Sequence, residues 1–144
     1  MSTVEEATRD LLLLMPRLVG RAKRMPVPAE FQSMALGPRH LSLLALLLFD
    51  GPQTVNDLAA RLEVAPATVS LMVGELSRPG VIERREDDHD RRRRIVSIAA
   101  AHQPAIEGWL GRGARGWRAA LEPLTPAQRE LFVATLRAYE SAVE

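Results

Sequence analysis

The sequence predicts a mainly α-helical protein with one small β-hairpin. Three observations lead to this fold class. Long segments carry apolar residues at helical spacing, two short helices in the middle of the chain are joined by a tight turn, and two short β-branched segments flank the charged run DDHDRRRR at residues 87–94. The chain has 144 residues, which is the size of one domain with a substantial core. We therefore expect a single domain over residues 1–144.

Composition limits the classes of function. The formal net charge is +1 and the pI about 8.4, so any basic surface has to be a local arrangement. The absence of cysteine excludes a disulfide framework, a thiolate metal site and a thiol redox switch, and it suits a reducing cytoplasm. The run LLLL at residues 11–14 follows acidic residues and precedes Pro16, so it predicts neither a signal peptide nor a membrane span. We expect a cytoplasmic protein without a membrane partner.

The first half of the chain predicts two helices separated by a connection. Residues 4–24 form an amphipathic helix by their apolar stripe of Val4, Ala7, Leu11, Leu14, Leu18 and Ala22. Residues 25–38 hold three prolines and a glycine, which predicts a connection. A helix then begins near Pro38 and stops at Asp50-Gly51-Pro52. Because LSLLALLLF is apolar nearly all round, we expect this helix to be buried at the centre of the core.

Residues 54–77 predict two short helices joined by a tight turn. Thr54 and Asp57 are spaced as a capping box, and Pro66 suits the first position of the next helix. The inner face of that second helix is apolar, with Val69, Met72, Val73 and Leu76. Three residues are left facing outward: Thr68, Ser70 and Leu71. Pro79-Gly80 ends the helix.

The charged run lies at the tip of a predicted hairpin. VIERRE at residues 81–86 and RIVSIA at residues 94–99 are short and rich in β-branched residues, which favours two strands with DDHDR between them. Two short helices followed by a hairpin is the order of a winged helix-turn-helix, in which the second helix enters the DNA major groove. An arginine at the tip reaches the narrow minor groove, whose negative potential attracts it. Aspartates beside it would pair with the arginines and reduce the side-chain entropy lost on binding.

Two motifs carry a family resemblance. Leu76-Ser-Arg-Pro-Gly-Val-Ile-Glu-Arg84 and Asp87-Asp-His-Asp-Arg-Arg92, preceded by a leucine-rich helix and a short capped helix, resemble the MarR family of winged-helix transcription regulators. The resemblance implies a winged helix-turn-helix lobe over about residues 36–99, with N- and C-terminal dimerisation helices at about 4–24 and 102–143. It further implies a homodimer on double-stranded DNA, most often a repressor that a small molecule relieves, with aromatic or phenolic compounds as frequent effectors.

The resemblance also implies the DNA-binding residues. In the family, the wing aspartate corresponding to Asp90 braces the arginine two residues on, here Arg92, which enters the minor groove. Arg93 and Arg94 would lie on the returning strand and contact phosphate at most. The C-terminal segments 102–122 and 125–143 fit the family's two dimerisation helices. The expected DNA-binding set is Pro66, Ala67, Thr68, Ser70, Leu71, Asp90, Arg91, Arg92, Arg93 and Arg94.

Three residues depart from the family pattern. Leu71 stands where many members carry a base-reading arginine, so base preference shifts toward apolar contact and DNA shape. Asp88 replaces the common proline of the wing turn. Ala65 occupies the N-cap of the second short helix, where serine is usual, which gives up about 1 kcal/mol of capping.

Other readings of the same residues are weaker. Asp87, His89 and Asp90 are competent ligands for a divalent cation, but four adjacent arginines disfavour one, so we expect no metal and no cofactor. Gly111, Gly113 and Gly116 spell G-x-G-x-x-G without the preceding strand that a phosphate cradle needs. Helical spacing runs through that motif, so we expect these glycines within a helix, where close packing against a crossing helix would explain them.

No catalytic constellation appears, so we do not expect an enzyme. The alternative to a DNA-binding regulator is a winged helix that serves protein–protein assembly. Binding through several phosphates weakens steeply with salt, whereas an apolar protein contact does not. Salt dependence therefore separates the two functions.

Overall fold

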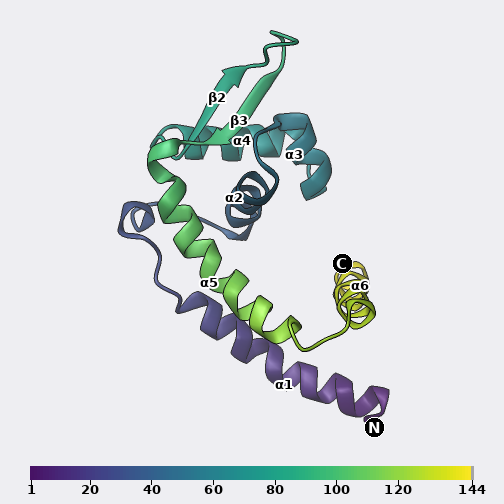
Figure 1. The fold of residues 1–144 in the computed structure, drawn as a ribbon. Helices are drawn as coiled ribbons and strands as arrows, with labels where there is room; N and C mark the ends of the chain where they lie inside the picture. Colours follow the sequence, from purple (N-terminus) through teal and green to yellow (C-terminus); the bar gives the residue numbers. More distant parts are fainter. Residues whose placement is uncertain (144) are drawn as a thin grey trace. The chain divides into compact units, whose positions relative to one another are not determined.

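The computed structural model describes residues 1–143, which fall into two units, Met1–Ala35 and a second that starts at Leu36 (Figure 1). The first unit holds helix α1 (Val4–Lys23) and the short 3-10 helix η1 (Ala29–Phe31). Thr3 caps α1 reciprocally: its hydroxyl accepts from the Glu6 backbone N–H, and the Glu6 carboxylate accepts from the Thr3 N–H. The predicted helix at 4–24 is confirmed.

The second unit begins with α2 (Pro38–Asp50), α3 (Val55–Leu62) and α4 (Pro66–Ser77), at the predicted positions. Helix α2 packs against α3, α5 and strand β3, and its Leu43, Leu44 and Leu47 are fully buried or nearly so. The core also takes in Leu58, Val69, Val73, Leu76, Val81, Ile82, Val96 and Ile106. The expectation that α2 is buried on nearly every side is wrong at its end, where Phe49 is 64% exposed because it lines an open groove between α2 and the end of α3.

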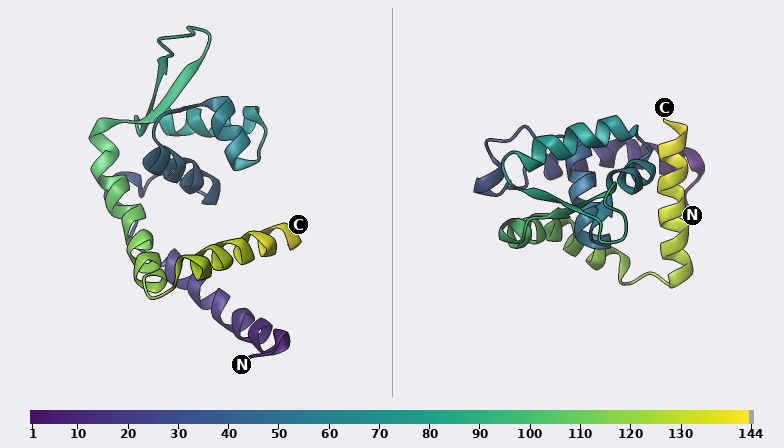
Figure 2. Two further views of the ribbon diagram at one scale, coloured as in Figure 1. Left: turned by 45° about the vertical axis from the view of Figure 1, so that its right-hand side comes forward. Right: turned by 90° about the horizontal axis from the view of Figure 1, so that it is seen from above.

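The hairpin consists of β2 (Ile82–Glu86) and β3 (Arg94–Ile98), paired antiparallel from Ile82 opposite Ile98 to Glu86 opposite Arg94. A further strand, β1 (Gln53–Thr54), pairs with β3 on its other side and gives the order β1-β3-β2. This strand was not predicted, since two residues before a helix cap carry no strand pattern. The hairpin projects from the helices of its unit in Figure 1 and in the left view of Figure 2.

Two long helices complete the second unit. The 3-10 turn η2 (Ala100–His102) leads into α5 (Gln103–Leu121), and α6 (Pro126–Ala142) follows a short loop. The Trp117 and Phe132 rings lie 5.6 Å apart between centroids and join the two helices. Arg129 donates to the carbonyls of Leu121 and Glu122, which satisfies acceptors at the end of α5. The predicted helices at 102–122 and 125–143 are confirmed.

The glycine motif lies inside α5, so it is not a phosphate cradle. Close packing against a crossing helix, which we expected as the reason for these glycines, is not present among the described residues: a Cβ at Gly113 or Gly116 would meet nothing within 4 Å, and one at Gly111 would meet only the Arg115 side chain of the same helix at 3.9 Å. None of the helices in residues 1–143 combines the length and the apolar composition that a membrane span requires.

Candidate nucleic-acid interface

The helix-turn-helix is built from α3, a turn and α4. The Thr54 hydroxyl accepts from the Asp57 backbone N–H at 3.1 Å and the Asp57 carboxylate accepts from the Thr54 N–H at 3.4 Å, so the predicted capping box is confirmed. The turn is made by Glu63, whose φ of 56° lies in the left-handed region that non-glycine residues seldom adopt. This conformation reverses the chain between the two helices.

Helix α4 presents a mixed outer face. Its Val69, Met72, Val73 and Leu76 are buried, as the spacing predicted. Ser70 and Leu71 are exposed and Thr68 is half-buried, so these three side chains are accessible. Leu71 is 60% exposed, so it offers an apolar side chain on the outer face. Pro66 and Ala67 form the exposed first turn of α4.

The N-cap of α4 lacks a side-chain hydrogen bond, because Ala65 occupies it. Ala65→Ser should raise the free energy of unfolding by about 1 kcal/mol, since the serine hydroxyl would accept from a first-turn N–H. Ala67→Ser is the matched control: the same change inside the first turn offers no cap and should cost about 0.5 kcal/mol or less. Chemical denaturation measures both; equal midpoints for the two variants would contradict the assignment of this cap.

The wing tip is held by its aspartates. The Asp90 carboxylate accepts from the backbone N–H of Arg92 at 3.0 Å and lies 3.4 Å from the Arg92 Nε. The Asp87 carboxylate accepts from the backbone N–H of His89 at 3.0 Å. Each aspartate thus closes a local turn by bonding the backbone two residues on. The Arg92 side chain is 91% exposed, so its guanidinium extends into solvent while Asp90 holds its backbone.

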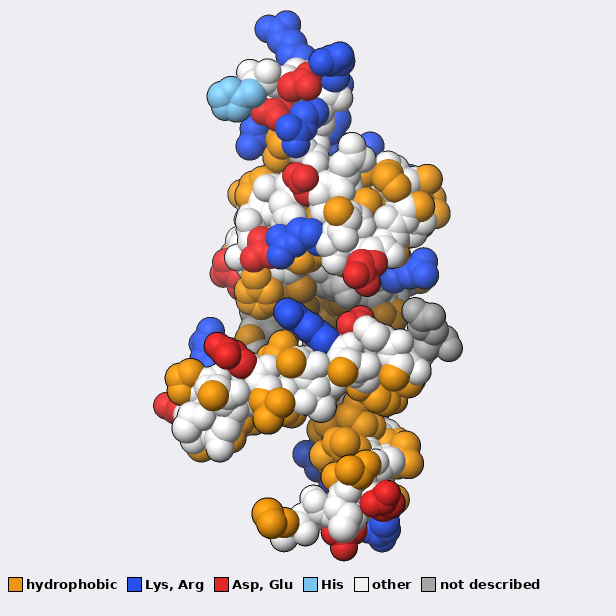
Figure 3. Space-filling view, turned by 90° about the vertical axis from the view of Figure 1, so that its right-hand side faces the viewer, with side chains coloured by type: hydrophobic (Ala, Val, Ile, Leu, Met, Phe, Trp, Pro, Cys, Tyr) orange, Lys and Arg blue, Asp and Glu red, His pale blue; other side chains and the backbone are white. Residues whose placement is uncertain are grey.

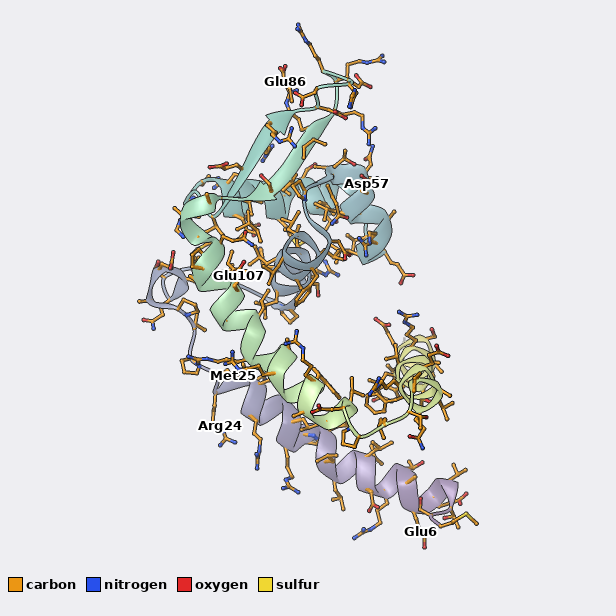
Figure 4. All side chains as sticks on the ribbon, in the orientation of Figure 1. Glu6, Arg24, Met25, Asp57, Glu86 and Glu107 are labelled. Carbon is orange, nitrogen blue, oxygen red and sulfur yellow. The ribbon has the colours of Figure 1, made fainter. Side chains whose placement is uncertain are left out.

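The remaining wing arginines have different surroundings. The Arg93 guanidinium lies 3.9 Å from the Asp87 carboxylate and 4.0 Å from that of Asp57 at the start of α3, which is labelled in Figure 4. Arg94 donates to the Arg91 carbonyl at 2.9 Å and lies 3.6 Å from Glu86 across the hairpin. Within residues 1–143 the Arg91 side chain forms no ion pair within 4 Å. The four arginines are therefore not equivalent.

Charge of both signs gathers at the wing tip, where the space-filling view shows basic, acidic and histidine side chains together (Figure 3). Asp87 and Asp90 accept turn hydrogen bonds and lie near arginines, and Asp87 is only 16% exposed, whereas Asp88 is exposed. Arg92 instead projects outward. The surface that the tip offers to a partner is therefore more basic than the composition of the run suggests.

A comparison with protein families matches the part of the chain that holds α3, α4 and the wing tip as far as Arg93. Residues 36–93 fit the sequence model of the MarR family. This match places the likeness to the MarR family on the winged-helix lobe. Among curated protein sequences, none matches the chain significantly.

Solved structures are similar to this chain over most or all of its length. A probable transcriptional regulator from Pseudomonas aeruginosa is 27% identical with a TM-score of 0.55, over 87% of this chain and 96% of that one. S. aureus MepR in its DNA-binding conformation is 18% identical with a TM-score of 0.62, over 92% and 98%. The PcaV regulator from Streptomyces coelicolor, solved with its natural ligand, is 19% identical with a TM-score of 0.58 over all of both chains. The last two likenesses are likenesses of fold.

Sequence reasoning missed two features of the wing. The link from Arg93 to Asp57 had no sequence signal, because the two residues are far apart in the chain and meet only when the hairpin folds back beside α3. The Glu86–Arg94 pair did have a sequence signal. A hairpin that is symmetric about its tip places Glu86 opposite Arg94, and these residues carry opposite charges.

Proposed function

We propose that this chain is a cytoplasmic, sequence-specific regulator of transcription that binds double-stranded DNA. The observation that carries the proposal is the combination of an exposed outer face on α4 with Arg92, 91% exposed and braced by Asp90, at the wing tip. A recognition helix in the major groove and an arginine in the minor groove need these two features on one lobe. The match of residues 36–93 to the MarR family model supports it.

The proposed contacts divide by role. Thr68, Ser70 and Leu71 face base edges, while the backbone at Pro66 and Ala67 approaches phosphate. In the wing, Arg92 enters the minor groove with Asp90 as its brace. Arg91, Arg93 and Arg94 add phosphate contacts, with the last two held by Asp57, Asp87 and Glu86. Phosphate contacts orient the lobe, and base contacts supply specificity.

A homodimer is part of the proposal. Helix α1 exposes a run of large apolar side chains: Leu11, Leu12, Leu13, Leu14, Met15, Leu18 and Val19. Helix α6 exposes another set: Leu131, Val133, Leu136 and Tyr139. Monomeric proteins seldom expose contiguous apolar patches of this extent, and a second copy of the chain buries them symmetrically. Two lobes then read a near-palindrome with half-sites about one helical turn apart.

We further propose repression that a small aromatic or phenolic effector relieves. Support comes from the fold shared with PcaV, which was solved with its natural ligand. Calorimetric titration of the purified dimer with a panel of phenolic acids, with and without operator, tests this part separately. Effector binding that leaves operator affinity unchanged would contradict relief by ligand.

DNA binding itself is tested by selecting genomic fragments with the purified protein and measuring affinity from about 50 to 200 mM salt. We expect one enriched near-palindromic motif and a loss of affinity on the order of a thousandfold or more over that range, as several phosphate contacts release counterions. Failure to enrich any motif, together with protein–protein binding that is insensitive to salt, would support the alternative of an assembly module instead.

Leu71→Arg should change the preferred operator rather than only its affinity. Leucine offers apolar contact, for instance to a thymine methyl, whereas arginine bonds guanine in a bidentate manner worth about 1 to 3 kcal/mol. We expect guanine to appear at one position of each half-site in the selected motif. Leu71→Met, which stays apolar, is the control and should keep the original motif. An identical motif for all three proteins would remove this residue from the interface.

A further inference from the structure

One polar contact joins the recognition helix to α2. The His40 Nε2 lies 2.6 Å from the Glu75 carboxylate of α4, and the His40 Nδ1 accepts from the Gly37 backbone N–H at 3.1 Å. Because Nδ1 is an acceptor, the ring proton sits on Nε2 and is donated to Glu75. A single neutral imidazole therefore caps the start of α2 and holds α4 at the same time.

The bond between His40 and Glu75 is the polar side-chain contact that attaches α4 to its neighbours in the described residues. Among the described residues, no other side-chain hydrogen bond or ion pair connects α4 with another element. The rest of its attachment is apolar packing through Val69, Met72, Val73 and Leu76. Apolar burial sets which face of α4 turns inward, but it is non-directional, so it fixes small rotations of the helix less firmly than a hydrogen bond does.

Glu75 lies next to the outer face of α4 that carries Thr68 and Leu71, so its contact with His40 is close to the residues proposed to read bases. Glu75 follows Leu71 by four residues, so the two side chains are neighbours along one side of α4. His40, Thr68, Leu71 and Glu75 all line one open groove between the start of α2 and α4. His40 is only 14% exposed, whereas Glu75 is 43% exposed, which places the contact at the edge of the core beside the side chains proposed to read bases.

We propose that His40 and Glu75 are positioning residues for operator recognition: their hydrogen bond sets the rotation of α4, and thereby where Thr68 and Leu71 meet the base edges. The inference rests on the DNA-binding function proposed above. Neither residue needs to touch DNA. Arg39, the other charged residue lining the groove, lies on α2 and does not connect the two helices.

Two small changes at Glu75 separate this role from plain electrostatics. Glu75→Gln removes a negative charge but keeps an acceptor at the same reach, whereas Glu75→Asp keeps the charge and withdraws the acceptor by one methylene. Electrostatics near DNA predicts tighter binding by the Gln variant and unchanged binding by the Asp variant. Positioning predicts operator binding within about twofold of the unaltered protein for Gln, and a loss of about tenfold for Asp, as a hydrogen bond to a charged group is removed.

His40 supplies the matching pair. In His40→Gln, the side-chain amide keeps both bonds, since glutamine at this position of a capping box accepts from the N-cap N–H and its NH₂ donates onward. His40→Ala loses both. We expect His40→Gln to bind operator like the unaltered protein and His40→Ala to lose about tenfold or more, with no further loss when Glu75→Asp is added.

The measurements are operator affinity, affinity for random-sequence DNA, and thermal melting of the dimer. Loss confined to the operator, with random-sequence affinity unchanged, supports positioning. Equal operator binding by the Asp and Gln variants of Glu75, or losses that match on both DNAs, overturns it. If the unaltered protein selects no operator at all, the proposed function has failed instead, so the two outcomes are distinct. The Glu75 substitutions are conservative and lie at a partly exposed position, so we expect both variants to fold. They test the proposal even if His40→Ala does not fold.

Discussion

A chain that carries both Leu11→Glu and Leu18→Glu should sediment at the 15.9 kDa mass of one chain and bind operator at least about a hundredfold more weakly. Leu11 and Leu18 are 53% and 42% exposed and lie two helical turns apart on one side of α1. Carboxylates at these positions would be buried without partners in the proposed apolar interface, which costs several kcal/mol. A monomer offers one lobe, so the second half-site no longer gains from a high effective concentration.

Arg9→Glu is the control for this prediction. It changes the net charge by two units, as the two leucine substitutions do together, but at a side chain 74% exposed on the far side of α1 from Leu11. Analytical ultracentrifugation at micromolar protein should show about twice the chain mass for the control and for the unaltered protein. A dimer that persists in the doubly substituted chain would place the interface elsewhere.

Arg92→Ala should weaken operator binding by about 1 to 3 kcal/mol, with the larger loss on operators with AT-rich flanks. The reason is geometric: Arg92 is the wing arginine that projects from a braced turn, whereas Arg93 and Arg94 are held by carboxylates. Arg91→Ala is the matched control, because it removes the same charge from the same tip. It should weaken binding modestly on all sequences and lower the salt slope by about one. Equal losses for the two variants would reduce the wing to a charge cluster.

Asp90→Ala sharpens the comparison. It removes a negative charge near DNA, so simple electrostatics predicts tighter binding. The bonds from Asp90 to the Arg92 backbone and side chain predict the opposite, because the arginine would lose its preorganisation. Operator titration at physiological salt decides between them, with circular dichroism to show that the fold is intact. Tighter binding would falsify the bracing role.

The helices could be predicted closely because their signals are local. Capping residues, prolines at first positions and apolar spacing depend on neighbours within a turn or two, and the Thr54–Asp57 box and Pro66 formed as expected. The cap of α1 by Thr3 and Glu6 has the same local pattern, a threonine followed three residues later by a carboxylate. The hairpin followed from two β-branched segments around a polar tip.

The arrangement of the candidate site could be predicted from the sequence only in part. Asp90 and Arg92 were paired from a family resemblance, and the structure gives the pair a local geometry. Arg93 was expected to contact phosphate at most, yet its guanidinium is held between Asp57 and Asp87. No spacing rule predicts such a contact, because it depends on how the hairpin lies beside α3.

The sequence by itself determined which segments are helical, which face of α4 turns inward and that an arginine-rich hairpin follows it, since these depend on short-range chemistry. Tertiary structure decided the partners: strand β1 on β3, Arg93 on Asp57, and the His40 bond to Glu75, each between residues far apart in the chain. It also left Phe49 exposed at the end of a helix that composition alone would bury. Long-range contacts depend on how packed elements align, and residue type carries little information about that alignment.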